Sequence, residues 1–63
     1  MIGICVKSND WFTLFNEYEI ALRSDGAIKA ESDYGCYWFL FDQGDGYYGC
    51  RDENGKEVSF LVE

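Results

Sequence analysis

The chain has 63 residues and a formal net charge of −7: twelve carboxylates stand against five Lys plus Arg, with no histidine. It also carries two Trp, five Tyr and five Phe. This length allows one domain, residues 1–63, and folding at this size buries only about 60% of the surface of the unfolded chain, so aromatic packing must supply much of the stability. The missing histidine excludes His-based triads, bases and metal ligands, and the acidic charge excludes direct binding to nucleic-acid phosphates.

The chain begins with a strand-like alternation. Ile2, Ile4 and Val6 alternate with smaller residues, and this period of two predicts a strand on which the three side chains share one face. A polar turn follows. Residues 11–16 then fit one turn of helix as well as a loop that plugs the open end of a barrel.

Two further strands follow around a hairpin turn. Residues 18–23 alternate with Tyr18, Ile20 and Leu22 on one face, and the next segment, Ser24-Asp25-Gly26, has the composition of a turn because glycine adopts positive φ readily. Residues 27–32 predict a weaker strand with a small inward pair.

The second half of the chain is richer in aromatic residues. Residues 36–41 form the most apolar stretch and predict a central strand, and 43–46 is a glycine-rich turn before a strand at 47–51. Asn54-Gly55 is the strongest hairpin signal in the chain. Residues 56–63 complete the pattern with alternating apolar side chains.

These segments amount to five or six short strands, with at most one helical turn near residues 11–16. Their order resembles small SH3-like β-barrel proteins of the kind encoded by phages and prophages. The residues that carry the resemblance are Leu14-Phe15-Asn16-Glu17-Tyr18-Glu19-Ile20 and the Asp52-Glu53-Asn54-Gly55 hairpin followed by Phe60. Many of those proteins have a Gly-Lys-x-Tyr-Glu-Val segment, where this chain has Phe15-Asn16-Glu17 before Tyr18.

The fold prediction is therefore all-β. Short strands in this number close most economically into a barrel, which removes exposed sheet edges. We expect either a small SH3-like barrel or a strongly bent antiparallel meander.

The sequence gives little support for catalysis or metal binding. Serine has no histidine base, and in an acidic chain Cys5, Cys36 and Cys50 lack the nearby cation or helix N-terminus that lowers a thiol pKa. No Cys-x-x-Cys pair is present, so we expect free, half-buried thiols, no metal site and no cofactor. Three cysteines are typical of a reducing cytosol, and no apolar stretch approaches the length of a membrane span. We predict a cytoplasmic protein that is not an enzyme.

Two Tyr-Gly-Cys triplets, at 34–36 and 48–50, are a further feature. Each glycine either forms a β-bulge, the interpretation we favour, or marks a place where the backbone of a partner comes close.

The aromatic residues exceed what one small barrel can enclose. Whichever parity of the strand at 36–41 faces inward, a large apolar side chain is left outside. We take Trp38, Trp11 and Tyr48 as candidate partner-binding anchors, because Trp and Tyr are enriched at interface hot spots. The alternative is a second cluster that caps the barrel end beneath the loop of residues 8–17.

The carboxylates lie in turns or at outward strand positions. Five of these carboxylates are predicted to bind the partner together with the aromatic anchors: Glu19, Asp42, Asp45, Asp52 and Glu53. Charge of this size is compatible with a merely soluble surface, but ordered negative charge also attracts a basic surface and speeds association.

Two functional hypotheses follow. The first is an acidic binding protein with a basic protein partner, such as a phage-encoded inhibitor of a host protein that handles nucleic acid; in its strong form the inhibitor mimics DNA. The second is a structural module that forms a homodimer or larger homo-oligomer through exposed aromatic residues. Neither hypothesis includes direct nucleic-acid or membrane binding.

Overall fold

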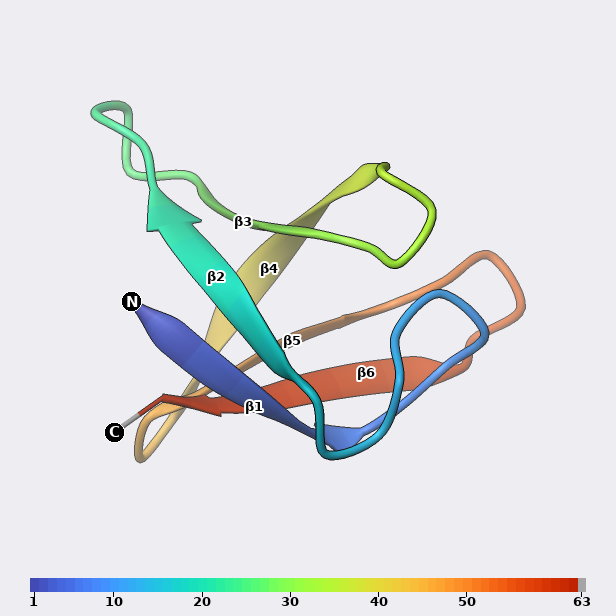
Figure 1. Cartoon of the computed structure of the whole chain (residues 1–63). Coiled ribbons are helices and arrows are strands. Elements are labelled where there is room, and N and C mark those ends of the chain that lie inside the picture. Colours follow the sequence, from blue (N-terminus) through green and yellow to red (C-terminus); the bar gives the residue numbers. More distant parts are fainter. Residues whose placement is uncertain (63) are drawn as a thin grey trace.

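The computed structural model describes residues 1–62 and shows six strands closed into one antiparallel barrel in chain order (Figure 1). The strands are β1 (Ile2–Lys7), β2 (Glu17–Leu22), β3 (Ile28–Glu31), β4 (Tyr37–Gly44), β5 (Tyr47–Arg51) and β6 (Glu57–Val62). Each strand pairs with the next, and β6 returns to pair with β1. The all-β prediction is confirmed, and the closed barrel is compatible with an SH3-like fold.

Two strands change partner along their length, which is how such short strands close the barrel. Residues 17–19 of β2 pair with β1, whereas residues 20–22 pair with β3. In the same way, residues 37–40 of β4 pair with β3, and from Phe41 onward β4 pairs with β5. The barrel is therefore two sheets that share β2 and β4.

The interior follows the alternation expected for β2, β3 and β6. Ile20, Ala30, Val58 and Phe60 are buried, together with Leu40 from β4. These inward faces agree with the sequence pattern, except that Leu22, at the end of β2, is 62% exposed.

The segment between β1 and β2 forms turns and no helix, so of the two alternatives for residues 11–16 the loop is correct. Its Phe12 is only 3% exposed and packs edge-to-face on Phe60, with ring centroids 5.0 Å apart. The loop therefore plugs one end of the barrel. Within residues 1–62 there is no helix, and hence none able to cross a membrane.

On β1 the large side chains face outward. Gly3 and Cys5 are buried, whereas Ile2, Ile4 and Val6 are exposed. A Cβ on Gly3 would lie 3.0 Å from Ile20 Cγ1 and 3.1 Å from the Cβ of Phe60. The barrel has no room for a side chain at that point, and this sets the parity of the strand.

The turn between β4 and β5 depends on left-handed backbone. Asp45 and Gly46 join β4 to β5 with φ of 56° and 86°, the two positive values that a two-residue hairpin requires. Phe15 also has a positive φ, 70°, and its side chain is 72% exposed. Glycine is the residue that adopts such a conformation without strain.

Candidate functional site

The outer face of β4 carries three aromatic side chains that the core does not cover. Tyr37, Phe39 and Phe41 are 59%, 54% and 70% exposed, and successive members lie about 7 Å apart along the strand. The opposite parity places Trp38 and Leu40 against the core. We call Tyr37, Phe39 and Phe41 the aromatic strip, and it is the surplus of aromatic residues expected from the composition.

A basic side chain from β3 lies along one edge of the aromatic strip. Lys29 is opposite Phe39 in the ladder, and its Nζ lies 4.1 Å from the centroid of the Tyr37 ring. This cation–π contact leaves Phe39 and Phe41 as the uncovered apolar part of the strip.

The other edge of the strip borders an opening between β4 and β5. The ladder joining these strands ends at the pair Phe41–Gly49, and residues 37–40 have Cα partners in β3 alone. The Ser32 N–H donates to the Cys36 carbonyl (2.7 Å). Because hydrogen-bonding direction alternates along a strand, the backbone groups of Tyr37 and Phe39 point away from β3, toward the opening.

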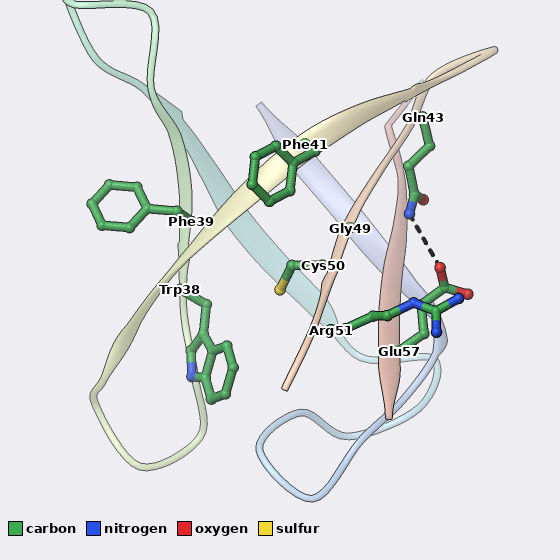
Figure 2. A pocket seen from close by; sticks show the side chains of 8 residues that line it. All are labelled: Trp38, Phe39, Phe41, Gln43, Gly49, Cys50, Arg51 and Glu57. Atoms are coloured by element: carbon green, nitrogen blue, oxygen red, sulfur yellow. Dashed lines mark hydrogen bonds between the residues drawn. The ribbon is translucent and has the colours of Figure 1, made fainter. Parts of the chain in front are cut away.

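This opening forms a surface groove of ≈ 480 Å³, the β4–β5 groove, shown in Figure 2. Phe39 and Phe41 project from β4, and Arg51 and Glu57 lie on the side of β5 and β6. The complete lining is Trp38, Phe39, Phe41, Gln43, Gly49, Cys50, Arg51 and Glu57.

Gly49 leaves space that other side chains fill. A Cβ there would collide with the backbone carbonyl oxygen of Val58 and would lie 2.9 Å from both Gln43 Nε2 and Ser59 Oγ. Ser59 Oγ donates to Gln43 Oε1 (2.9 Å), so this pair is held over the glycine.

The bulge interpretation of the two Tyr-Gly-Cys triplets is wrong. Gly49 pairs in regular register with Phe41 and Ser59, and Gly35 lies in the β3–β4 hairpin with φ of 82°. The register shifts within residues 1–62 occur elsewhere, between Cys5 and Lys7 and between Asp42 and Gly44. One glycine therefore permits close packing of β5 against its neighbours, and the other permits a turn.

The 8–16 loop, the β3–β4 hairpin and the β5–β6 hairpin gather at one end of the barrel (Figure 1). Side chains from these three segments line a second groove. Its volume is ≈ 520 Å³. It is lined by Asp10, Trp11, Tyr34, Glu53 and Asn54. We call it the loop-end groove.

Aromatic rings form the apolar part of the loop-end groove. The rings of Trp11 and Tyr34 are nearly perpendicular, at 85°, with centroids 5.5 Å apart. Tyr34 is 72% exposed. Trp11 is half-buried and packs on Trp38, with centroids again 5.5 Å apart. The two Trp rings therefore connect the two grooves.

The carboxylates of the loop-end groove differ in their partners. Asp10 Oδ1 lies 3.3 Å from Lys56 Nζ, an exposed ion pair. Glu53 is exposed and forms no ion pair with any described residue. One negative charge of the groove is thus balanced within the chain and the other is free.

Asp33 holds the loop and the hairpin that form this groove. Its Oδ1 accepts from the Tyr18 hydroxyl (2.6 Å) and its Oδ2 from the Thr13 hydroxyl (2.7 Å). These hydrogen bonds lower the pKa of Asp33 below its usual value. Burial and the same hydrogen bond to Asp33 raise the pKa of Tyr18. The Asp33 N–H also donates to the Trp11 carbonyl (3.0 Å), which ties Trp11 to the hairpin.

The predicted anchors Trp38, Trp11 and Tyr48 are half-buried and pack against the core. The expectation that they would be the exposed aromatics is wrong, because Trp38 and Tyr48 have the inward parity of their strands and Trp11 packs on Trp38. Trp11 nevertheless lines the loop-end groove, and Trp38 lines the β4–β5 groove.

The aromatic strip and Tyr34 were not among the surface residues predicted from the sequence. The signal was present, because one parity of the strand at 36–41 is entirely aromatic. Choosing the exposed parity required knowledge of the space inside the barrel.

Asp52 does not belong to the surface and is removed from the predicted partner-binding set. It is 9% exposed, and its Oδ1 accepts from the backbone N–H groups of Asn54 and Lys56, both at 2.9 Å. A carboxylate at this position organises the β5–β6 hairpin, which explains its burial.

The other predicted carboxylates are exposed but are not gathered at one place. Glu53 lines the loop-end groove. Glu19 pairs with the N-terminal amine (3.3 Å), Asp42 accepts from the Gly44 N–H (2.8 Å), and Asp45 lies in the β4–β5 turn.

All three cysteines are free thiols. Cys5 and Cys50 are buried and Cys36 is exposed, and burial raises the pKa of Cys5 and of Cys50. No cluster of three or more His, Cys, Asp or Glu side chains within residues 1–62 is arranged to hold a metal ion.

No protein-family model, curated protein or solved structure matches the chain. The features of the chain that bear on function are therefore the aromatic strip, the two grooves and the distribution of charge.

Proposed function

We propose that this chain is a non-enzymatic, acidic binding protein that docks on a basic surface of another protein. The observation that carries the proposal is the aromatic strip, which is exposed on a chain of net charge −7. Protein interfaces have a desolvated centre rich in aromatic residues and a polar rim. Phe39 and Phe41 would supply that centre.

The rim draws on exposed carboxylates without ion-pair partners among residues 1–62, of which Glu31 lies opposite Tyr37 in the β3–β4 ladder and Asp42 follows Phe41 on β4. Glu17, Asp45 and Glu53 also lack such partners but lie away from the strip. Complementary charge at a rim raises the association rate and selects against acidic partners, and salt weakens it.

The partner class that suits this charge is a host protein whose basic surface handles nucleic acid. In this proposal the chain is a phage-encoded inhibitor that acts in the host cytoplasm, with DNA mimicry as its strong form. Mimicry needs rows of unopposed negative charge. Lys7, Arg23 and Lys56 pair with Glu57, Asp25 and Asp10, so such a row would have to be formed by the remaining carboxylates.

The second candidate function is homo-oligomerisation through the same aromatic strip. The exposure of Phe39 and Phe41 favours it equally, but two copies of an acidic chain repel each other at low ionic strength. Salt screens that repulsion, so self-association would persist or strengthen as salt is added.

Capture from a bacterial lysate tests the proposal. We expect the immobilised chain to recover a specific basic protein at about 50 mM salt and to lose it at about 300 mM, where the screening length is much shorter. Phe39→Ser should abolish capture. Leu22→Ser is the matched control, because Leu22 is 62% exposed on β2 and lies outside the strip. No recovered protein at low salt, together with a stable dimer by light scattering, would support the oligomer and overturn the proposal.

A further inference from the structure

We propose that the loop-end groove receives a single arginine side chain of the partner. The guanidinium would lie on the exposed face of Tyr34, between the carboxylates of Asp10 and Glu53. This inference rests on the proposed function, since it identifies the chemical group that the acidic surface recognises.

The aromatic rings give the groove affinity for a cation. A ring face carries negative potential, and cations within about 6 Å of a ring centroid are attracted to it. The centroids of Trp11 and Tyr34 are 5.5 Å apart and their planes are nearly perpendicular, so Trp11 packs against the Tyr34 ring and supports it. Tyr34 is the most exposed Tyr or Trp of the described chain, so its ring is accessible.

A lysine of the chain already pairs with one carboxylate of this groove. Lys56 extends from the β5–β6 hairpin to Asp10 in the 8–16 loop, with 3.3 Å between Nζ and Oδ1. Glu53 has no such partner among residues 1–62. The site therefore retains one uncompensated carboxylate, and Lys56 competes with an incoming cation for the other.

The groove is formed before any ligand arrives. Asp33 binds Tyr18 and Thr13 through its two carboxylate oxygens, and its N–H holds the Trp11 carbonyl. Asn9 is 6% exposed, and its Oδ1 accepts from the Trp11 N–H (2.9 Å). A preorganised site loses less entropy on binding than a mobile one.

Arginine suits this arrangement better than lysine. Its planar guanidinium stacks on an aromatic face while its N–H groups bind carboxylates, and it is more weakly hydrated than an ammonium group. The negative charge of Asp10 and Glu53 rules out an anionic ligand at the same place.

The probe is Nα-acetyl-L-argininamide, a monocation that mimics one arginine of a protein chain. We expect a saturable shift of the Trp11 indole N–H resonance in NMR titrations, tighter than the shift caused by Nα-acetyl-L-lysinamide. The neutral Nα-acetyl-L-glutaminamide should cause no shift. Equal affinity for the arginine and lysine probes, or small shifts spread over the whole acidic surface, would overturn the proposal.

Three variants locate the site. Tyr34→Ala should weaken binding of the arginine probe about two- to five-fold, the size of an exposed cation–π contact. Glu53→Gln should also weaken it, while Lys56→Gln should tighten it by releasing Asp10. Phe41→Ala, on the strip, is the control and should change nothing. Unchanged affinity in both Tyr34→Ala and Glu53→Gln would show that the probe binds elsewhere.

The two proposals fail in different ways. Capture of a salt-sensitive basic partner, combined with no binding of the arginine probe, would remove the groove and leave the proposed function. Saturable binding of the probe, combined with no capture at low salt, would leave the groove and overturn the docking function.

Discussion

Gly49 offers the sharpest test of the barrel, because the close approach of neighbouring groups predicts a large loss of stability when a side chain is added there. Its φ is not in the left-handed region, so backbone strain plays no part. The cost of Gly49→Ala comes only from the added Cβ, which would meet the Val58 carbonyl oxygen, Gln43 Nε2 and Ser59 Oγ. The carbonyl belongs to the β5–β6 ladder, so it moves only if the strands separate.

The loss of folding stability expected for Gly49→Ala is that of an overpacked site. Forcing an extra methyl into a well-packed site costs about 1–3 kcal/mol, and the fixed carbonyl places this change at the upper end. A domain of this length has a total stability of roughly 3–9 kcal/mol. A loss of about 2–3 kcal/mol would lower Tm by roughly 10–20 °C.

Gly35→Ala is the matched control. Gly35 has φ of +82°, and a Cβ there would meet nothing within 4 Å, so only the left-handed backbone opposes alanine, at about 1–2 kcal/mol. Thermal unfolding followed by circular dichroism should rank the chains as wild type, Gly35→Ala, then Gly49→Ala. A Gly49→Ala chain with the Tm of the wild type would refute the close approach of β5 and β6.

Further predictions address the loop, acid stability and the thiols. Phe15→Gly should raise Tm by a few degrees, because relief of about 1–2 kcal/mol of left-handed strain exceeds the roughly 0.5–1 kcal/mol entropic cost of glycine; a lower Tm would mean that the Phe15 ring packs on the surface. Because folding lowers the pKa of Asp33, its stabilisation is present above its unfolded pKa of about 3.9 and is lost as pH falls through the lower folded value. Urea unfolding should therefore show a shallower loss of stability below about pH 4 in Asp33→Asn, and an unchanged slope would contradict this. A thiol reagent followed by intact mass should label Cys36 rapidly, and Cys5 and Cys50 only on unfolding; rapid labelling of all three would show that the barrel opens.

The strands could be predicted because their signals are local. Alternation in β2, β3 and β6, and the Asn54-Gly55 turn, depend on residues close in sequence, and the structure agrees with them. Local sequence signals could not predict which alternating set of side chains in β1 and β4 faces the barrel interior. It depends on the space between strands, as at Gly3, where Ile20 and Phe60 leave no room for a side chain.

The residues of the candidate surface also could not be predicted from local sequence alone. The excess of aromatic residues was evident from composition, but Trp38 and Phe39 are adjacent, and only the barrel decides which of them faces the solvent. Asp52 looked like any turn carboxylate until its hydrogen bonds to the hairpin backbone were seen. The loop-end groove joins Asp10, Tyr34 and Glu53, which are far apart in sequence.

The central claim is that acidic charge directs this chain to a basic partner. The most direct measurement is the affinity of the captured partner for the wild-type chain between about 50 and 300 mM salt, across which screening increases strongly. We expect the affinity to fall steeply across this range. An affinity that is constant or rises with salt would contradict electrostatic docking on a basic partner.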